Sequence, residues 1–157
     1  EAGLPKVECA KRRLQTLNSE VEIDAYPYRL TKENAHELIS RYDIVVDGMD
    51  NFATRYIVSD ECKLQGKPYV YGAIRGLDGQ VAVLCKGHTT YRSLLPDEEA
   101  TLSMPHPGKA VLGTTPAVVG SVEACQVLML AAEFGEPLID KLWTVDLSTM
   151  MSYVIDM

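Results

Sequence analysis

The spacing of apolar residues in the first part of the chain predicts two helices with a strand between them. Apolar residues recur every three or four positions over residues 5–17, which is typical of an amphipathic helix. They alternate with polar residues over residues 21–25, the period of a half-buried strand. Thr31 then precedes a second helical segment, residues 32–42, and has a side chain suited to an N-cap.

A run of β-branched residues, Ile44 to Val46, predicts the next strand. Because its apolar residues do not alternate with polar ones, we expect this strand to be covered on both faces. The run ends in a polar cluster, residues 47–51, and a helix over residues 51–65 follows at once. Gly66 is the expected terminator of that helix.

The second half of the chain predicts paired strands around one apolar helix. Residues 68–76 have the composition of a strand, and Asp78–Gly79 stands between two strand-like runs, which indicates a tight hairpin. Residues 87–110 contain three prolines and no clear period, so we expect a long crossover loop. An apolar helix over residues 117–134 and two C-terminal strands follow. The order of elements predicts an α/β fold whose sheet is parallel at first and becomes antiparallel toward the C-terminus.

The overall composition limits the classes of partner. The chain has 157 residues, 46% of them hydrophobic, which suits a single domain over residues 1–157. A net charge of -7 and the lack of a basic run make nucleic acid an unfavoured partner. No apolar run approaches the roughly 18 residues of a membrane span, so no membrane partner is expected. The start of the sequence does not resemble an export signal, and we expect a cytoplasmic location.

Four cysteines, Cys9, Cys62, Cys85 and Cys125, are widely spaced along the chain. They form no CxxC pair, so the sequence indicates neither a zinc site nor a redox-active dithiol. We expect reduced and mostly buried thiols.

The polar cluster at residues 47–51 is the main candidate for chemistry. In open α/β sheets, ligands bind beyond the carboxyl ends of the strands, which is where this cluster lies. Asp50 or Asn51 could serve only as the N-cap of the following helix. Asp47 and Asp50, on either side of a glycine, would also suit Mg²⁺, which takes one or two carboxylates and leaves its other positions to water and phosphate. Local physical chemistry leaves both alternatives open.

The segment DGMDNFATRY around this cluster resembles the Asp-x-x-Asp-Asn-x-x-x-Arg signature of the ThiF/MoeB/HesA family, the bacterial relatives of ubiquitin-activating enzymes. The similarity extends along almost the whole chain. Residues 3–23 resemble a family helix and the turn after it, with Ser19 in place of the usual proline. Residues 66–84 resemble the following strand and hairpin, and residues 111–128 resemble the start of the late helix. The resemblance implies a Rossmann-like, ubiquitin-activating-enzyme fold.

The resemblance also implies an ATP site. Asp50 is similar to the family aspartate that holds Mg²⁺ against the ATP phosphates, which makes it the expected catalytic residue and metal ligand. Asn51 and Arg55 are similar to residues that shape the same pocket, and Lys6 matches a lysine that reaches the phosphates. A lysine neutralises phosphate charge as a point cation. Two alternatives stay open: Lys6 could be a solvated lysine at a helix start, and Arg55 could be a structural partner of Asp47 or Asp50.

The sequence departs from the family pattern in three places. It contains no Gly-x-Gly-x-x-Gly segment, so we infer that the N-terminal nucleotide-binding βαβ portion is missing and that the chain is a fragment, inactive on its own. Thr90 and Ser93 stand where many relatives have a CxxC, and hydroxyls are poor zinc ligands, so zinc is not expected. His106 lies near the position of a cysteine that handles sulfur in thiamine-type members; we expect an ordinary loop histidine there rather than a catalytic one.

Together these features predict the C-terminal portion of an adenylyltransferase that uses ATP and Mg²⁺. Its expected partner is a small ubiquitin-like sulfur carrier of the thiamine or molybdopterin type, whose Gly-Gly tail is activated, and relatives suggest a homodimer. Two alternatives are a same-fold enzyme that adenylates a tRNA nucleoside or a peptide, and a non-catalytic partner subunit. Retention of both Asp50 and Lys6 disfavours the last of these.

Overall fold

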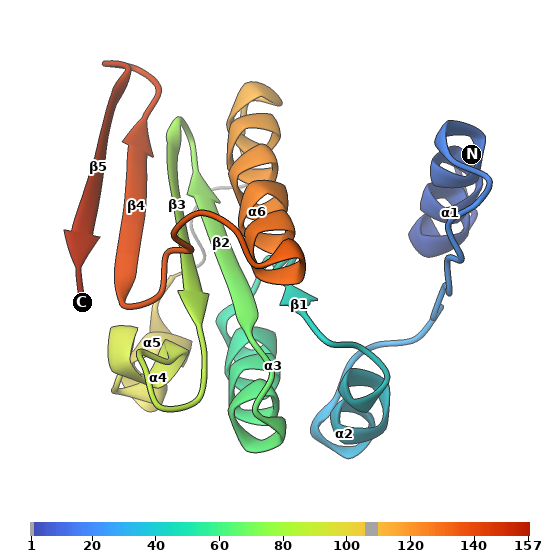
Figure 1. Ribbon diagram of the computed structural model, residues 1–157, viewed down its shortest axis with the longest axis horizontal. Coiled ribbons are helices and arrows are strands. Elements are labelled where there is room, and N and C mark those ends of the chain that lie inside the picture. The colour runs from blue at the N-terminus through green and yellow to red at the C-terminus, as the bar shows by residue number, and fades with distance from the viewer. Residues whose placement is uncertain (1, 106–109) are drawn as a thin grey trace. The chain divides into compact units, whose positions relative to one another are not determined.

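The computed structural model describes residues 2–105 and 110–157 of the chain (Figure 1). It forms two compact units, Glu1–Leu30 and Thr31–Met157. The smaller unit contains one helix, and the larger unit contains the whole described sheet. The interpretation of residues 1–157 as a single domain stays a prediction.

The smaller unit confirms the first helix but not the strand expected after it. Helix α1 (Lys6–Leu17) follows Pro5 as its N-cap residue and has no buried residue. Residues 21–30 form neither helix nor strand, so the predicted strand over residues 21–25 is wrong. Alternation of apolar and polar residues makes a strand only where a neighbour accepts the backbone hydrogen bonds, and every strand of the described sheet lies after residue 44.

The larger unit begins with two helix–strand pairs that lead into a hairpin. The elements are α2 (Lys32–Ser40), β1 (Val45–Val46), α3 (Phe52–Gln65), β2 (Tyr69–Arg75) and β3 (Asp78–Leu84). Strand β1 is parallel to β2, whereas β2 and β3 are antiparallel. Helix α3 ends as predicted at Gly66, whose φ of 70° is the left-handed conformation that glycine adopts most easily.

The turn of the β2–β3 hairpin lies two residues earlier than the sequence suggested. Arg75 pairs with Asp78, so Gly76 and Leu77 make the turn and Gly79 lies inside β3. A Cβ atom at residue 79 would come within 2.4 Å of the Val119 side chain. The glycine at that position therefore allows a helix to approach closely and does not make the turn.

The remaining elements are α4 (Tyr91–Leu94), α5 (Glu98–Ser103), α6 (Thr114–Ala132), β4 (Lys141–Asp146) and β5 (Met151–Asp156). Helices α4 and α5 lie within residues 87–110, so the expectation of a continuous loop there is wrong. Each short helix has a polar cap: the Thr90 backbone N–H donates to Ser93 Oγ at 3.1 Å, and Asp97 accepts from the Ala100 N–H at 2.9 Å. Such short helices depend on caps and leave no detectable period.

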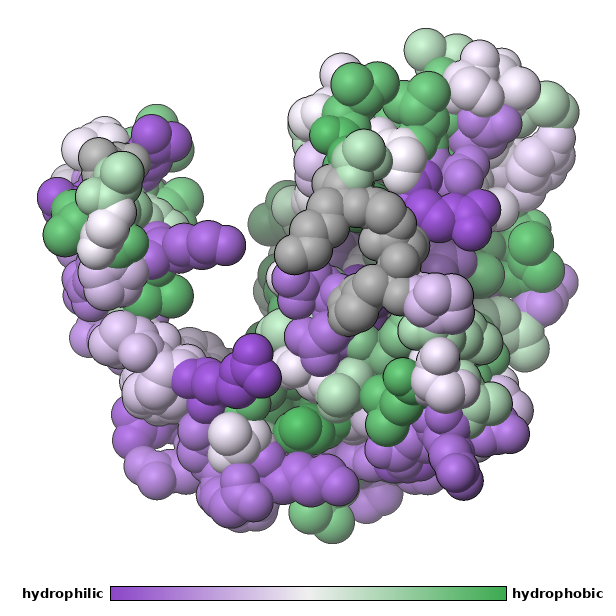
Figure 2. Space-filling view, turned by 180° about the vertical axis from the view of Figure 1, so that it is seen from behind, coloured by the Kyte–Doolittle hydropathy of each residue, from purple (hydrophilic) through white to green (hydrophobic). Residues whose placement is uncertain are grey.

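The sheet has the order β1-β2-β3-β4-β5, with one parallel pair followed by three antiparallel pairs. This confirms the predicted α/β class and the change from parallel to antiparallel. The C-terminal hairpin expected from the sequence is formed by β4 and β5. Figure 2 shows hydrophilic side chains predominating along the lower margin of the larger unit, where α2 and α3 lie.

Helix α6 packs on one face of the sheet, and the tyrosines of β2 point to the other. Val119 of α6 joins Val70, Val81 and Val83 in a buried cluster. By length and composition alone α6 could also cross a membrane, since its most apolar 18 residues have a mean hydropathy of 1.4. The sequence-based statement that no run approaches such a length is therefore wrong. Helix α6 packs on β2 and β3, and 22% of this 18-residue window is buried.

Two expectations about burial are also wrong. Val46 is 44% exposed, because β1 is an edge strand of the described sheet and is not covered on both faces. Of the four cysteines, all of them free, only Cys62 is buried, and burial raises its pKa to about 12. The other three lie at partly or fully exposed positions, which their apolar sequence neighbours did not reveal.

Candidate functional site

The polar cluster lies at the carboxyl end of β1, where Asp47 is its buried member. The Asp47 backbone N–H donates to the Val70 carbonyl at 2.8 Å, which extends the β1–β2 pairing by one residue. Its carboxylate accepts from Arg55 Nε at 2.8 Å and from the Met49 backbone N–H at 2.7 Å. Asp47 therefore uses both carboxylate oxygens inside the protein.

Arg55 extends from the first turns of α3 into the same buried region. One of its terminal nitrogens, Nη2, donates to the carbonyl of Met49 at 2.7 Å and to that of Gly72 at 3.1 Å, and its guanidinium lies 5.5 Å from the centre of the Tyr71 ring. Burial disfavours the charge of Arg55, but the neighbouring Asp47 outweighs this effect and the pKa of Arg55 is raised. The ion pair with Asp47 bears out the structural alternative for Arg55. Arg55 would shape a nucleotide pocket through the loop that it holds, and this role stays a prediction.

Asn51 and Asp50 have different roles in the loop. Asn51 is the N-cap of α3, because its side-chain oxygen accepts from the Thr54 backbone N–H at 2.9 Å. Its side-chain nitrogen donates to Asp50 Oδ1 at 3.2 Å. The capping function left open between the two residues thus belongs to Asn51, and Asp50 lies exposed at the surface of the loop.

These positions decide which carboxylate fits a magnesium ion. Mg²⁺ keeps several waters and usually takes one or two carboxylates together with substrate phosphates. Asp47 is buried and engaged by Arg55, so it is not available as the second carboxylate of a two-aspartate site. Asp50, on the exposed loop, fits a site in which one carboxylate, water and phosphate share the metal. Within residues 2–105 and 110–157, no group of three or more histidine, cysteine or acidic residues could hold a metal by itself.

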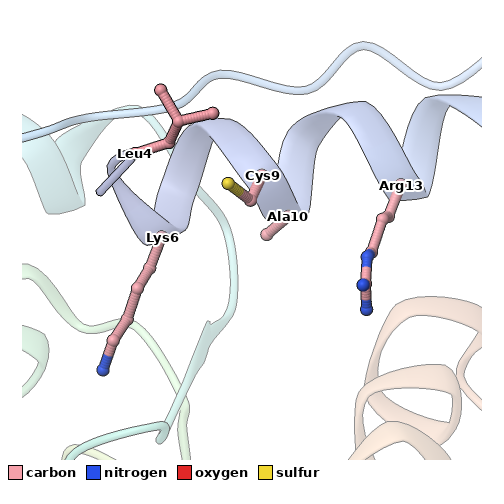
Figure 3. A pocket seen from close by; sticks show the side chains of 5 residues that line it. All are labelled: Leu4, Lys6, Cys9, Ala10 and Arg13. Atoms are coloured by element: carbon pink, nitrogen blue, oxygen red, sulfur yellow. The ribbon is translucent and has the colours of Figure 1, made fainter. Parts of the chain in front are cut away.

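Lys6 belongs to the smaller unit, where it lies along a shallow pocket on α1. The pocket has a volume of about 390 Å³ and is lined by Leu4, Lys6, Cys9, Ala10 and Arg13. Figure 3 shows Lys6 and Arg13 extending from the same side of α1, Lys6 near the start of the helix and Arg13 farther along it. That arrangement suits an anionic group, and Lys6 as a ligand of the ATP phosphates stays a prediction.

Thr90 and Ser93, which make zinc unexpected, lie in a segment whose polar side chains have partners within the protein. The hydroxyls of Thr90 and Ser93 lie 3.2 Å apart at the start of α4. Asp140 accepts hydrogen bonds from Thr89 Oγ1 at 2.9 Å and from the Thr89 backbone N–H at 2.8 Å. The cap of α4 is thus made by hydroxyl hydrogen bonds of Thr90 and Ser93.

We predict that the protein purified in metal-free buffer carries no stoichiometric zinc. The reason is that the hydroxyls of Thr90 and Ser93 bind zinc poorly compared with thiolates. Elemental analysis by mass spectrometry measures the content directly, and about one zinc per chain would contradict the prediction. The double variant Thr90→Cys/Ser93→Cys is the matched comparison. It shows how much zinc an introduced CxxC binds under the same conditions.

Sequence reasoning missed a second group of polar residues near the cluster. Tyr69, Tyr91 and Glu123 are buried and bring polar atoms toward Asp47 and Arg55. The one available signal was an acidic residue, Glu123, in the middle of a strongly apolar helix. His106, considered above as a catalytic alternative, lies outside the described residues.

Comparisons with known proteins agree with this architecture. The model of the ThiF family matches residues 1–157. The chain is 45% identical over 155 residues to the sulfur carrier protein adenylyltransferase of Thermus thermophilus, covering 93% of this chain and 56% of that protein. It is 35% identical over 151 residues to the SAMP-activating enzyme E1 of Haloferax volcanii, covering 96% of this chain and 56% of that protein. The chain thus spans about half the length of these relatives.

Solved structures give the same fold. The crystal structure of E. coli MccB with ATP superposes with a TM-score of 0.81 and 21% identity, over 99% of this chain and 48% of that one. At this identity the likeness establishes the fold alone.

Proposed function

The chain belongs to the ThiF family, and from this we propose that the full-length protein is an ATP-dependent adenylyltransferase acting on the C-terminal carboxylate of a small ubiquitin-like sulfur carrier. The names of the two relatives described above, an adenylyltransferase of a sulfur carrier protein and an E1 enzyme, support this choice of substrate class. ATP as the cosubstrate is supported by a structural neighbour solved with it.

The observation that carries the proposal is the exposed position of Asp50. It lies on the loop of residues 47–51, whose backbone is held by two largely buried side chains. Asp47 and Arg55 hold the backbone of Met49 by its N–H and by its carbonyl. A loop held in this way presents the Asp50 carboxylate in a constant position at the carboxyl end of β1. Preorganisation of this kind is what electrostatic stabilisation of a phosphate transition state requires.

In the proposed reaction, the carrier carboxylate attacks the α-phosphorus of ATP. A carboxyl–phosphate bond forms, the bond between the α-phosphorus and the bridging oxygen breaks, and pyrophosphate leaves with the electron pair. Mg²⁺, when bound, offsets negative charge on the phosphates. Asp50 would hold the metal, Lys6 would meet phosphate oxygens as a point charge, and Asn51 and Arg55 would keep the loop in place.

The experiment that tests this function is ATP–pyrophosphate exchange by the full-length protein. Exchange should require a carrier protein that ends in Gly-Gly, and removal of the last glycine should abolish it, because the attacking carboxylate is then misplaced. Exchange that proceeds with a tRNA or a short peptide, and not with a carrier, would overturn the choice of substrate.

We further propose that the protein is a homodimer that uses its C-terminal hairpin and α6. Tyr153 and Val154 of β5 are 52% and 55% exposed although they point to opposite faces of the strand, and Leu128 of α6 is exposed as well. Figure 2 shows hydrophobic atoms interspersed with polar ones on the right-hand side, where β5 lies. A strand left uncovered on both faces and along its edge is a surface that associates readily.

The change Val154→Asp is expected to convert the dimer into a monomer, since it places a charge in the apolar contact. Leu64→Asp on α3 is the matched control, because Leu64 is also an exposed apolar residue but lies outside the predicted contact. Sedimentation velocity of the full-length protein measures both. A wild-type protein that stays monomeric at high concentration would exclude the dimer.

A further inference from the structure

In the part of the chain that the structure describes, three buried side-chain atoms near the Asp47–Arg55 ion pair have no hydrogen-bond partner. They are the hydroxyls of Tyr69 and Tyr91 and the Oε1 atom of Glu123. Asp47 is close enough to Tyr69, and Arg55 to Tyr91, to influence the pKa of each hydroxyl, although neither contact has the geometry of a hydrogen bond. Unpartnered buried atoms are uncommon in folded proteins, and three of them around one ion pair call for an explanation.

Glu123 lies close to this region because Gly72 has no side chain. Its carboxyl group comes from α6 and lies against Gly72 of β2, where a Cβ atom would come within 2.3 Å of Oε1. From the α3 side, Arg55 donates to the carbonyl of the same glycine. Gly72 therefore lets two charged side chains from opposite faces of the sheet approach one point, and Glu123 is only 8% exposed there.

The charges in this cluster do not balance if Glu123 is ionised. Among residues 2–105 and 110–157, Asp47 and Glu123 are the acids and Arg55 is the one cation that influences Glu123. Tyr69, Tyr71 and Tyr91 contribute hydroxyl groups. Arg55 already donates to Asp47, Met49 and Gly72. A buried carboxylate with an unpartnered oxygen is far less stable than the neutral acid in the same place.

The electrostatic surroundings agree with this geometric reasoning. Burial, followed by the negative charge of Asp47, raises the pKa of Glu123 to about 7, against an opposing effect of Arg55. The folded protein therefore keeps Glu123 protonated to a higher pH than the unfolded chain does. The stabilising contribution of Glu123 is fully present below the ordinary carboxyl pKa and is lost as the pH rises through about 7.

We propose that Glu123 is a positioning residue for the Asp50 loop: as a neutral acid it leaves Arg55 bound to Asp47 and to the Met49 carbonyl, and as a carboxylate it competes for Arg55 and loosens residues 47–51. Its link to catalysis rests on the proposed function. Its effect on the loop does not, because the hydrogen bonds of Met49 can be measured without ATP.

The first test is amide hydrogen exchange of Met49 in the full-length protein between pH 6 and 8.5. The change Glu123→Gln keeps the shape of the side chain and removes its proton equilibrium. Protection in the wild type and in Glu123→Gln should agree at pH 6, and at pH 8.5 the wild type should be less protected, on the order of tenfold. The control is Glu133→Gln, which removes one exposed negative charge at the end of the same helix and should behave like the wild type.

Superimposable protection of the wild type and Glu123→Gln at every pH would overturn the proposal. So would an equal gain in protection in Glu133→Gln, because a general charge effect would then explain the result. If the glutamine variant is too unstable to measure, Glu123→Met removes the titrating group without adding a donor, and the same comparison applies.

A second readout ties the residue to the proposed reaction. The KM for ATP in pyrophosphate exchange should rise with pH from 6.5 to 8.5 more steeply in the wild type than in Glu123→Gln, on the order of fivefold more, because the loosened loop positions Asp50 less well. Absence of exchange in every protein would remove the proposed function and leave the amide measurement to decide the role of Glu123. Normal exchange with identical pH profiles in both proteins would reject the positioning role and leave the function standing.

Discussion

Replacement of Asp50 by alanine in the full-length protein is expected to abolish ATP–pyrophosphate exchange while leaving the fold intact. The Asp50 carboxylate is exposed on the loop, and in the proposed function it holds the metal at the phosphates. Loss of such a contact removes several kcal/mol of transition-state stabilisation, so a fall of at least ~100-fold in the exchange rate is expected.

The stability of the same variant separates this role from a purely structural one. The cap of α3 is made by Asn51, so Asp50→Ala should leave the melting temperature almost unchanged. By contrast, Asn51→Ala should lower stability by about 1 kcal/mol, the usual effect of losing an N-cap. A matched control is Asp43→Ala, which removes an exposed aspartate just before β1 and should leave exchange unaffected. Near-normal exchange by Asp50→Ala would show that the carboxylate has no part in metal binding.

Replacement of Asp47 by alanine is expected to destabilise the protein by about 3–5 kcal/mol, because it leaves the Arg55 guanidinium buried without its partner. The Met49 backbone N–H loses its acceptor in the same variant. For a protein of this size each kcal/mol corresponds to roughly 2–4 °C in melting temperature, so thermal melts resolve the effect easily.

A double-mutant cycle distinguishes the loss of the ion pair from a general loss of packing. Arg55→Ala should also be strongly destabilising, since it leaves the Asp47 carboxylate unpaired in the interior. The double variant Asp47→Ala/Arg55→Ala should be less destabilised than the sum of the two single variants, because no unpaired charge remains. Strict additivity, or a loss below about 1 kcal/mol for Asp47→Ala, would contradict the assignment of this pair. Asp43→Ala again provides the control for removing a surface acid.

The sequence by itself determined the class of the fold and most of its helices and strands. The caps and terminators are local signals: Thr31 before α2, Asn51 before α3 and the left-handed Gly66 after it act through backbone groups a few residues away. Such signals are complete within one turn, so they can be recognised without knowing the rest of the structure. The change from a parallel to an antiparallel sheet followed from the order of elements and the presence of hairpins.

Three of the failures concern contacts with distant parts of the chain. The alternation at residues 21–25 needs a neighbouring strand, and none of the strands of the described sheet supplies one. Gly79 suggested a turn, but its role is to admit Val119 of a helix 40 residues later in the sequence. The exposure of Val46 depends on its position at the edge of the described sheet, which its own sequence does not specify.

The candidate site shows the same division. The sequence identified Asp47, Asp50, Asn51 and Arg55 as a group, because they lie within nine residues and resemble a family signature. It left open which aspartate pairs with Arg55 and which residue caps α3. The tertiary structure decided both, and it added Glu123, which α6 brings against Gly72 of β2. The physical reason is that capping signals act over a few residues, whereas burial, ion pairing and proton binding depend on all the groups that folding brings together.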